Sequence, residues 1–250
     1  MSSFRYTRND NFPPVIKNLL IINVLVYIAQ VTLENQFHVT DKIELHAVLP
    51  PNLDEALAGV KLTRFNPYQL LTYMFAHAPN NFGHILFNMF ALWMFGRILE
   101  NFWGPKRFLF FYIVSGLGAG FLHLAIQYFR ITQIVHGLSV EQIVQGINAD
   151  GPFATDLFRA MSSALGASGA IMGIMAAFGY LFPNTELMFF PLPIPIKAKW
   201  FVIGYVALDL FGGITNSSSD NVAHFAHLGG ALTGFIIVYI WNKTNRKTLY

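Results

Sequence analysis

Six stretches of apolar residues follow one another along the chain and constrain its fold more than any other feature of the sequence. A helix needs about 20 predominantly apolar residues to cross the hydrocarbon of a bilayer. Charged residues make up only 12% of the 250 positions, about half their usual share in a soluble domain. So little charge cannot cover a water-soluble globule, and it excludes a disordered or nucleic-acid-binding protein. We therefore predict an all-α integral membrane protein whose six transmembrane helices fall at about residues 19–33, 83–99, 108–129, 161–182, 200–213 and 222–241.

The positions of lysine and arginine predict how these helices are oriented. With the N-terminus inside, 11 of the 16 basic residues fall in inner segments. The positive-inside rule then places both termini in the cytoplasm. No small-x-small cleavage site follows the first stretch, so we expect a retained span and not a signal peptide. The chain is thus predicted to be a multi-pass protein of a cell (cytoplasmic or inner) membrane.

The segments between the helices differ in character. The first outer segment, at about 34–82, has no apolar run of 18 residues and is expected to lie on the outer membrane surface. The long segment at about 130–160 contains Ser139 and Gln142 at the spacing of a helix capping box. The inner segment PLPIPIKAK has alternating prolines and is predicted to be extended.

A chain of 250 residues is long enough for one domain or at most two, and we expect a single domain. It contains no internal repeat or low-complexity tract. It has no cysteine, which excludes disulfides, thiolate metal sites and cysteine catalysis. The predicted organisation over 1–250 is a membrane core at about 66–241, a cytoplasmic N-terminal segment at 1–18 and a cytoplasmic tail at 242–250.

Polar residues inside membrane helices are costly and tend to mark function. Ser168 lies in the sequence Gly-Ala-Ser-Gly, which begins at Gly166 in the fourth stretch. Gly169 and Gly173 form a small-xxx-small pair, which lets two helix backbones approach closely. Taken alone, Ser168 is explained as one more small residue at such a contact.

The sixth stretch carries His227 on a face of small residues. Gly230 and Gly234 follow it at i+3 and i+7, on the same side of a helix. This side faces a neighbouring helix and not lipid. Taken alone, His227 is explained as a core histidine that bonds a backbone carbonyl.

The second stretch has two polar residues one turn apart, His84 and Asn88. Both can form hydrogen bonds between helices, and both have donors that can hold an oxyanion. Glu100 and Arg97 lie at the opposite, inner end of this stretch, where an ion pair or a helix cap explains them.

Asp209 lies near the outer end of the fifth stretch and is expected to be interfacial. A third catalytic member needs a contact that spacing alone does not establish, so we expect Asp209→Asn to change little.

The predicted depths of these groups agree with one another. Spans two, four and six all descend from the outside, which places Ser168 about seven residues into its span, roughly 10 Å deep at 1.5 Å per residue. His227, His84 and Asn88 fall at similar depths. The chemistry that fits is acyl transfer, in which a base activates a serine and donors stabilise the tetrahedral oxyanion. We expect those donors to be His84, Asn88 and the Ser168 backbone N–H beside Gly166, with water entering near the polar outer segment GGITNSSSDN.

Together, Gly-Ala-Ser-Gly, Ala-His-x-x-Gly-x-x-x-Gly and His-x-x-x-Asn resemble the motifs of the rhomboid intramembrane serine proteases. The segment NPYQLLTYMFAH before the second span is similar to the family's membrane-embedded outer loop. The resemblance implies a Ser168–His227 dyad, with Ser168 as nucleophile and His227 as general base. It implies that His84 and Asn88 stabilise the oxyanion, and that substrates are membrane-spanning proteins within the lipid bilayer. It implies no metal or cofactor, and it assigns no oligomeric state.

Some positions depart from the family pattern. Met172 stands where members often have an aromatic residue that packs on the histidine, and Tyr68-Gln69 replaces a Trp-Arg pair. The segment at about 130–160 is also longer than in the compact bacterial members. These differences concern efficiency and substrate choice.

Three other kinds of protein remain as alternatives. An inactive rhomboid-like protein that binds membrane clients typically lacks the serine or the histidine, and both are present here. A metal-binding protein or transporter can use a histidine pair at i and i+3, but no acidic residue adjoins that pair in sequence. A channel or carrier needs inverted repeats or broken helices, which the sequence lacks. The candidate metal ligands in the second case are His224 and His227, with His84, His77 and His123.

Overall fold

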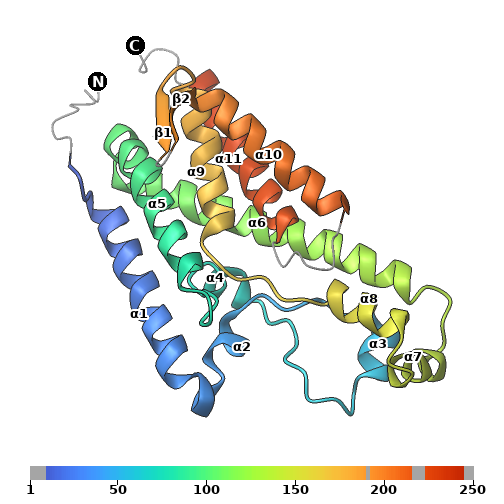
Figure 1. The fold of residues 1–250 in the computed structure, drawn as a ribbon. Coiled ribbons are helices and arrows are strands. Elements are labelled where there is room, and N and C mark those ends of the chain that lie inside the picture. The colour runs from blue at the N-terminus through green and yellow to red at the C-terminus, as the bar shows by residue number, and fades with distance from the viewer. Residues whose placement is uncertain (1–9, 190–191, 216–222, 245–250) are drawn as a thin grey trace.

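The computed structural model describes residues 10–189, 192–215 and 223–244, and within them the chain is mostly helical (Figure 1). Over these residues, five helices are long and apolar enough to cross a membrane: α1 (Pro14–Phe37), α5 (Phe82–Trp103), α6 (Pro105–Ile134), α10 (Ala198–Thr215) and α11 (His224–Thr244). A sixth apolar helix, α9 (Ser168–Leu181), has only 14 residues. Each predicted apolar stretch therefore contains one helix, which confirms the fold class, although a two-stranded hairpin is added.

Some predicted segments fall outside the described residues. They are residues 1–9 and 245–250 of the predicted cytoplasmic ends, and residues 216–222 of the polar segment before the last helix.

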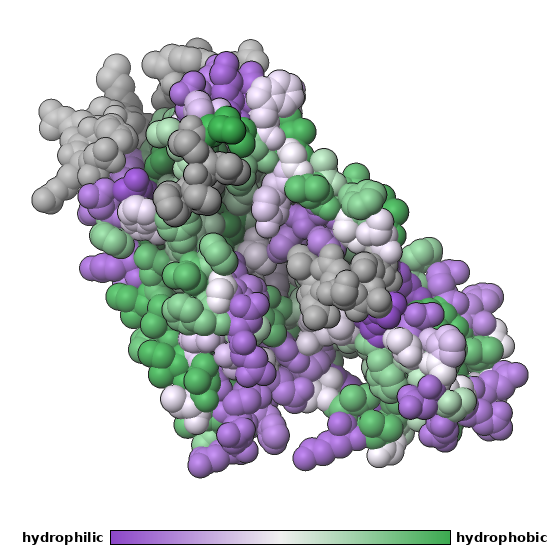
Figure 2. Space-filling model, in the orientation of Figure 1, coloured by the Kyte–Doolittle hydropathy of each residue, from purple (hydrophilic) through white to green (hydrophobic). Residues whose placement is uncertain are grey.

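Helix α9 occupies the centre of the bundle, packed against α6 and α11 (Figure 1). Every residue from 169 to 179 is buried. By contrast, apolar side chains cover the outer surface of α1 and α5 (Figure 2). Large exposed apolar side chains of this kind are expected where a helix faces lipid and not water.

The start of α9 differs from the prediction. We expected a helix from 161, but it begins at Ser168. The preceding segment is held by the outer loops instead, because Ala164 pairs with Leu45 through backbone hydrogen bonds of 2.8 and 3.0 Å. Gly166 has φ +124°, which a helix does not allow, and its N–H donates to the Tyr73 carbonyl at 2.9 Å. Such irregular backbone is tolerated in a membrane protein where it is buried in protein.

Small residues set the distance between α9 and α11, as predicted. A Cβ on Gly234 would lie 2.5 Å from the Gly173 Cα, and a Cβ on Gly173 would lie 3.0 Å from the Gly230 carbonyl oxygen. Both positions must be glycine for the two backbones to approach this closely. The close crossing brings the N-terminal ends of the two helices together.

The outer segments at 34–82 and 130–160 contain five short helices: α2 (Val39–Ile43), α3 (Pro51–Ala56), α4 (Gln69–Thr72), α7 (Val140–Asn148) and α8 (Pro152–Ala160). Helices α3, α7 and α8 lie together at the end of α6 (Figure 1) and share a second apolar core with it. The predicted capping box at Ser139 and Gln142 is present at the start of α7. The buried residues of the second core are Ala47, Leu53, Leu57, Ile131, Val135, Ile143 and Leu157.

The proline-rich segment is extended over residues 192–197, as predicted. These residues form β2 (Leu192–Lys197), which pairs antiparallel with β1 (Glu186–Phe189). Pro191 lies outside the described residues, and Ala198 and Lys199 belong to α10, so the extended segment is shorter than predicted. Glu100 was expected to form an ion pair with Arg97 or a helix cap at the end of its own stretch, but it caps the start of another helix, α1. Its carboxylate accepts the Val15 and Ile16 N–H groups at 2.9 and 2.8 Å.

Candidate active site

Ser168 and His227 lie in direct contact. The Ser168 hydroxyl donates to His227 Nε2 at 2.8 Å. Ser168 is the first residue of α9 and His227 is in the first turn of α11, so the close crossing of these two helices creates the contact. The first N–H groups of a helix have no intrahelical partner, and the N-terminus of a helix favours negative charge. The serine therefore stands where both a base and oxyanion donors are available.

His84 and Gly166 lie beside this pair. The Ala78 N–H donates to His84 Nδ1 at 3.3 Å, so the neutral ring carries its proton on Nε2. A Cβ on Gly166 would lie 3.0 Å from His84 Nε2 and 3.5 Å from the Ser168 hydroxyl oxygen. The glycine thus keeps open a space between a hydrogen-bond donor and the serine.

Asn88 shares a cavity of about 480 Å³ with Ser168 and His227. One of its amide N–H groups donates to the His84 carbonyl at 2.8 Å, which leaves the second N–H of the amide group. Met172, which stands in place of the usual aromatic residue, also lines this cavity. The remaining lining comes mainly from α5, with two further residues each from α9 and α10 and with Met188 of β1.

Asp209 is the residue that sequence reasoning left out of the site. It is 4% exposed, although most of α10 is not buried. His227 Nδ1 donates to it at 3.1 Å from each carboxylate oxygen, and His224 Nδ1 donates to it at 2.7 Å. Helix α10 turns this side chain inward, so Asp209 is buried beside the two histidines, while its position near the membrane interface stays a prediction. The sequence has no acidic residue next to the pair His224 and His227. In the fold, Asp209 of α10 lies beside that pair.

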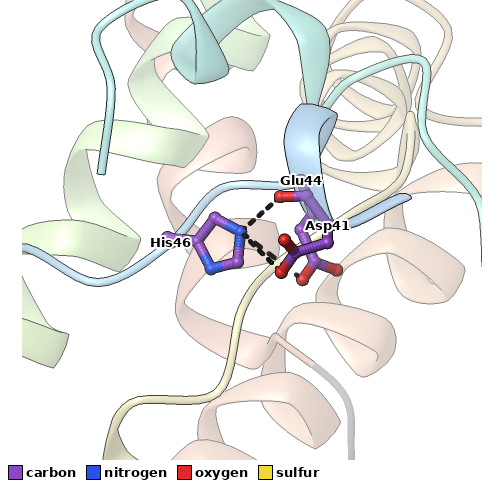
Figure 3. A group of neighbouring side chains, drawn as sticks. All are labelled: Asp41, Glu44 and His46. Atoms are coloured by element: carbon purple, nitrogen blue, oxygen red, sulfur yellow. Dashed lines mark hydrogen bonds and ion pairs between the residues drawn. The ribbon is translucent and has the colours of Figure 1, made fainter. Parts of the chain in front are cut away.

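A second polar cluster, at Asp41, Glu44 and His46, was not predicted either. Among the residues that the structure describes, it is the one group of three histidine and acidic side chains whose ligand atoms all lie within 4.8 Å of one another (Figure 3). His46 Nε2 donates to the Asp41 carbonyl oxygen at 2.6 Å and lies 3.7 Å from a Glu44 carboxylate oxygen. Burial raises the pKa of the Glu44 carboxyl above its ordinary value. The hydrogen bond and the nearby carboxylate account for the arrangement, which lies in the outer segment and not beside Ser168.

Comparisons with known proteins identify the family. The model of the Rhomboid domain matches residues 64–244. The chain therefore belongs to the rhomboid family. It is 29% identical to Rhomboid protease AarA of Providencia stuartii, over 88% of this chain and 69% of that protein. It is also 29% identical to the mitochondrial Rhomboid protein 1 of Saccharomyces cerevisiae, over 77% of this chain. The match spans about half, 53%, of the yeast protein.

Proposed function

We propose that this rhomboid-family protein is an intramembrane serine endopeptidase that uses Ser168 as nucleophile and His227 as general base. The observation that carries the proposal is the 2.8 Å hydrogen bond between the two side chains at the meeting point of α9 and α11. A serine hydroxyl is a weak nucleophile until a positioned base takes its proton. The names of the bacterial relatives AarA and GluP, both rhomboid proteases, support this activity.

The proposed reaction places each neighbouring group in a role. The Ser168 oxygen attacks a peptide carbonyl while its proton moves to His227, which later passes the proton to the leaving amine. The developing oxyanion is held by the Ser168 backbone N–H, His84 Nε2 and the Asn88 amide, with Gly166 leaving space for it. Water then hydrolyses the acyl-enzyme, and His227 again serves as base. Every step is carried by residues of this chain, without a metal or cofactor.

The proposed substrates are membrane-spanning proteins. The cavity beside Ser168 is lined on one side by α5 and on the other by α10. Phe87 and Phe90 of its lining are 72% and 49% exposed, on the lipid-facing surface of α5. A segment that enters between these helices arrives from the bilayer and meets the serine at the inner end of the cavity. The distribution of basic residues favours a cell membrane with both termini in the cytoplasm, and hence a site in the outer leaflet.

The test is cleavage of a single-span model substrate in proteoliposomes. The wild type is expected to release a fragment cut near the outer end of the substrate's helix. Ser168→Ala and His227→Ala are expected to abolish the release while the protein still folds. Ser162→Ala, at an exposed serine six residues earlier, is a matched control that should cleave like the wild type. Retained cleavage in Ser168→Ala would refute the proposal, and substrate binding without cleavage by the wild type would favour the client-binding alternative.

A further inference from the structure

Asp209 contacts the proposed base on the side away from the nucleophile. His227 Nε2 faces Ser168 at 2.8 Å, and His227 Nδ1 faces the Asp209 carboxylate at 3.1 Å. An isolated buried carboxylate is strongly disfavoured, so the two histidine N–H groups are what stabilise its charge. Three side chains from α9, α11 and α10 thus stand in the order serine, histidine, aspartate.

From this order we infer that Asp209 is a positioning residue for His227, which makes the proposed Ser-His dyad a Ser-His-Asp triad; the inference rests on the proposed function. The carboxylate accepts the Nδ1 proton and thereby leaves the Nε2 lone pair directed at the serine hydroxyl. In the triads of soluble serine proteases the aspartate fixes the tautomer and orientation of the histidine in the same way.

Asp209 also balances charge during the reaction. As the Ser168 oxygen bonds to the substrate carbonyl carbon, its proton moves to His227 Nε2 and the ring becomes a cation. Asp209 stays ionised and lies beside that cation, which costs less in a buried site than an unpaired charge. When the C–N bond breaks, His227 gives the proton to the leaving amine and the ring returns to its neutral form.

His224 provides the internal comparison for this role. It donates at 2.7 Å to Asp209 Oδ1, an oxygen that His227 Nδ1 also contacts. If Asp209 merely tied α10 to α11, the loss of either partner would weaken the same link and lower stability alone. If Asp209 acts through His227, removing the carboxylate lowers turnover far more than removing His224 does.

The experiment measures kcat, KM and thermal unfolding for the full chain in proteoliposomes with the single-span substrate. Asp209→Asn is expected to lower kcat by roughly 10²- to 10⁴-fold, the upper figure being the loss in a soluble triad. KM should stay within about threefold, because Asp209 does not touch the substrate. Asp209→Glu keeps the carboxylate one methylene further out and is expected to restore part of kcat. His224→Gln is expected to lose at least tenfold less kcat than Asp209→Asn.

A second buried carboxylate serves as the matched control. Glu100 is 2% exposed and caps α1 at the far end of α5, so Glu100→Gln should lower the unfolding temperature and leave kcat per folded molecule unchanged. An unchanged kcat in Asp209→Asn, or a change in KM alone, would overturn the inference. If Asp209→Asn does not fold, Asp209→Ser, which also removes the carboxylate, decides: a lowered kcat at constant KM supports the triad and a wild-type kcat refutes it. Ser168→Ala separates the two proposals, because its retained activity would refute the protease itself.

Discussion

The crossing of α9 and α11 predicts that a methyl group two turns away from His227 disables the site. In Gly234→Ala the new Cβ would lie 2.5 Å from the Gly173 Cα, and 2.7 Å from its carbonyl oxygen. Both are backbone atoms, so relief requires the helices to separate by about 1 Å, to the 3.4 Å of an ordinary contact. Overpacking of this kind costs about 1–3 kcal/mol, and a 1 Å misplacement of catalytic groups costs roughly 10²-fold in rate.

The assay for Gly234→Ala is initial cleavage rate per folded molecule, together with thermal unfolding in the same detergent. Gly204→Ala on α10 is the matched control, because nothing lies within 4 Å of its Cβ position. In that variant the helix propensity of alanine should leave stability equal or raise it by up to about 1 kcal/mol. The reasoning is refuted if Gly234→Ala, like the control, keeps the unfolding temperature and the cleavage rate of the wild type.

Three further substitutions test individual contacts. Asn88→Ala should lower kcat by roughly 10- to 1,000-fold with little effect on unfolding, as expected for one oxyanion donor; an unchanged kcat would remove it from the site. Gly166→Ala forces a side chain into φ +124° and against His84 Nε2, so cleavage should fall sharply and the fold should lose about 1–3 kcal/mol; full activity would contradict the geometry. Partial burial raises the pKa of the Glu44 carboxyl above its ordinary value of 4.5. The carboxyl therefore binds its proton more tightly in the folded state, and this stabilising contribution is lost as pH rises through the raised pKa. Unfolding temperatures between pH 4 and 8 should therefore fall less with rising pH in Glu44→Gln than in the wild type, and identical curves would contradict the assignment.

The sequence predicted those parts of the fold that depend on local patterns. Apolar length located the six helices, the Ser139–Gln142 spacing located the start of α7, and the prolines predicted the extended segment. The start of α9 was not predictable in this way. It is set by hydrogen bonds to the outer loops, such as that from Gly166 to the Tyr73 carbonyl, which join residues far apart in sequence.

The same distinction between local patterns and contacts of distant residues applies to the candidate site. Glycine spacing on two helices predicted the face that carries His227, and the contact with Ser168 follows from that packing. Asp209 has no such pattern around it. Its direction depends on how α10 is rotated against α11, and only its burial beside His224 reveals it. The one available signal was an acidic residue within an apolar stretch, which is costly unless it has a buried partner.

The most direct test of the central claim is covalent labelling of the folded protein in detergent with a small fluorophosphonate, located by mass spectrometry. The probe reports an activated serine, because the hydroxyl oxygen must displace fluoride from phosphorus. The account predicts one label per molecule, on Ser168, in the wild type and in Ser162→Ala, and none in Ser168→Ala or His227→Ala. Labelling at another residue, labelling that survives His227→Ala, or an unlabelled wild type that is fully folded would contradict it.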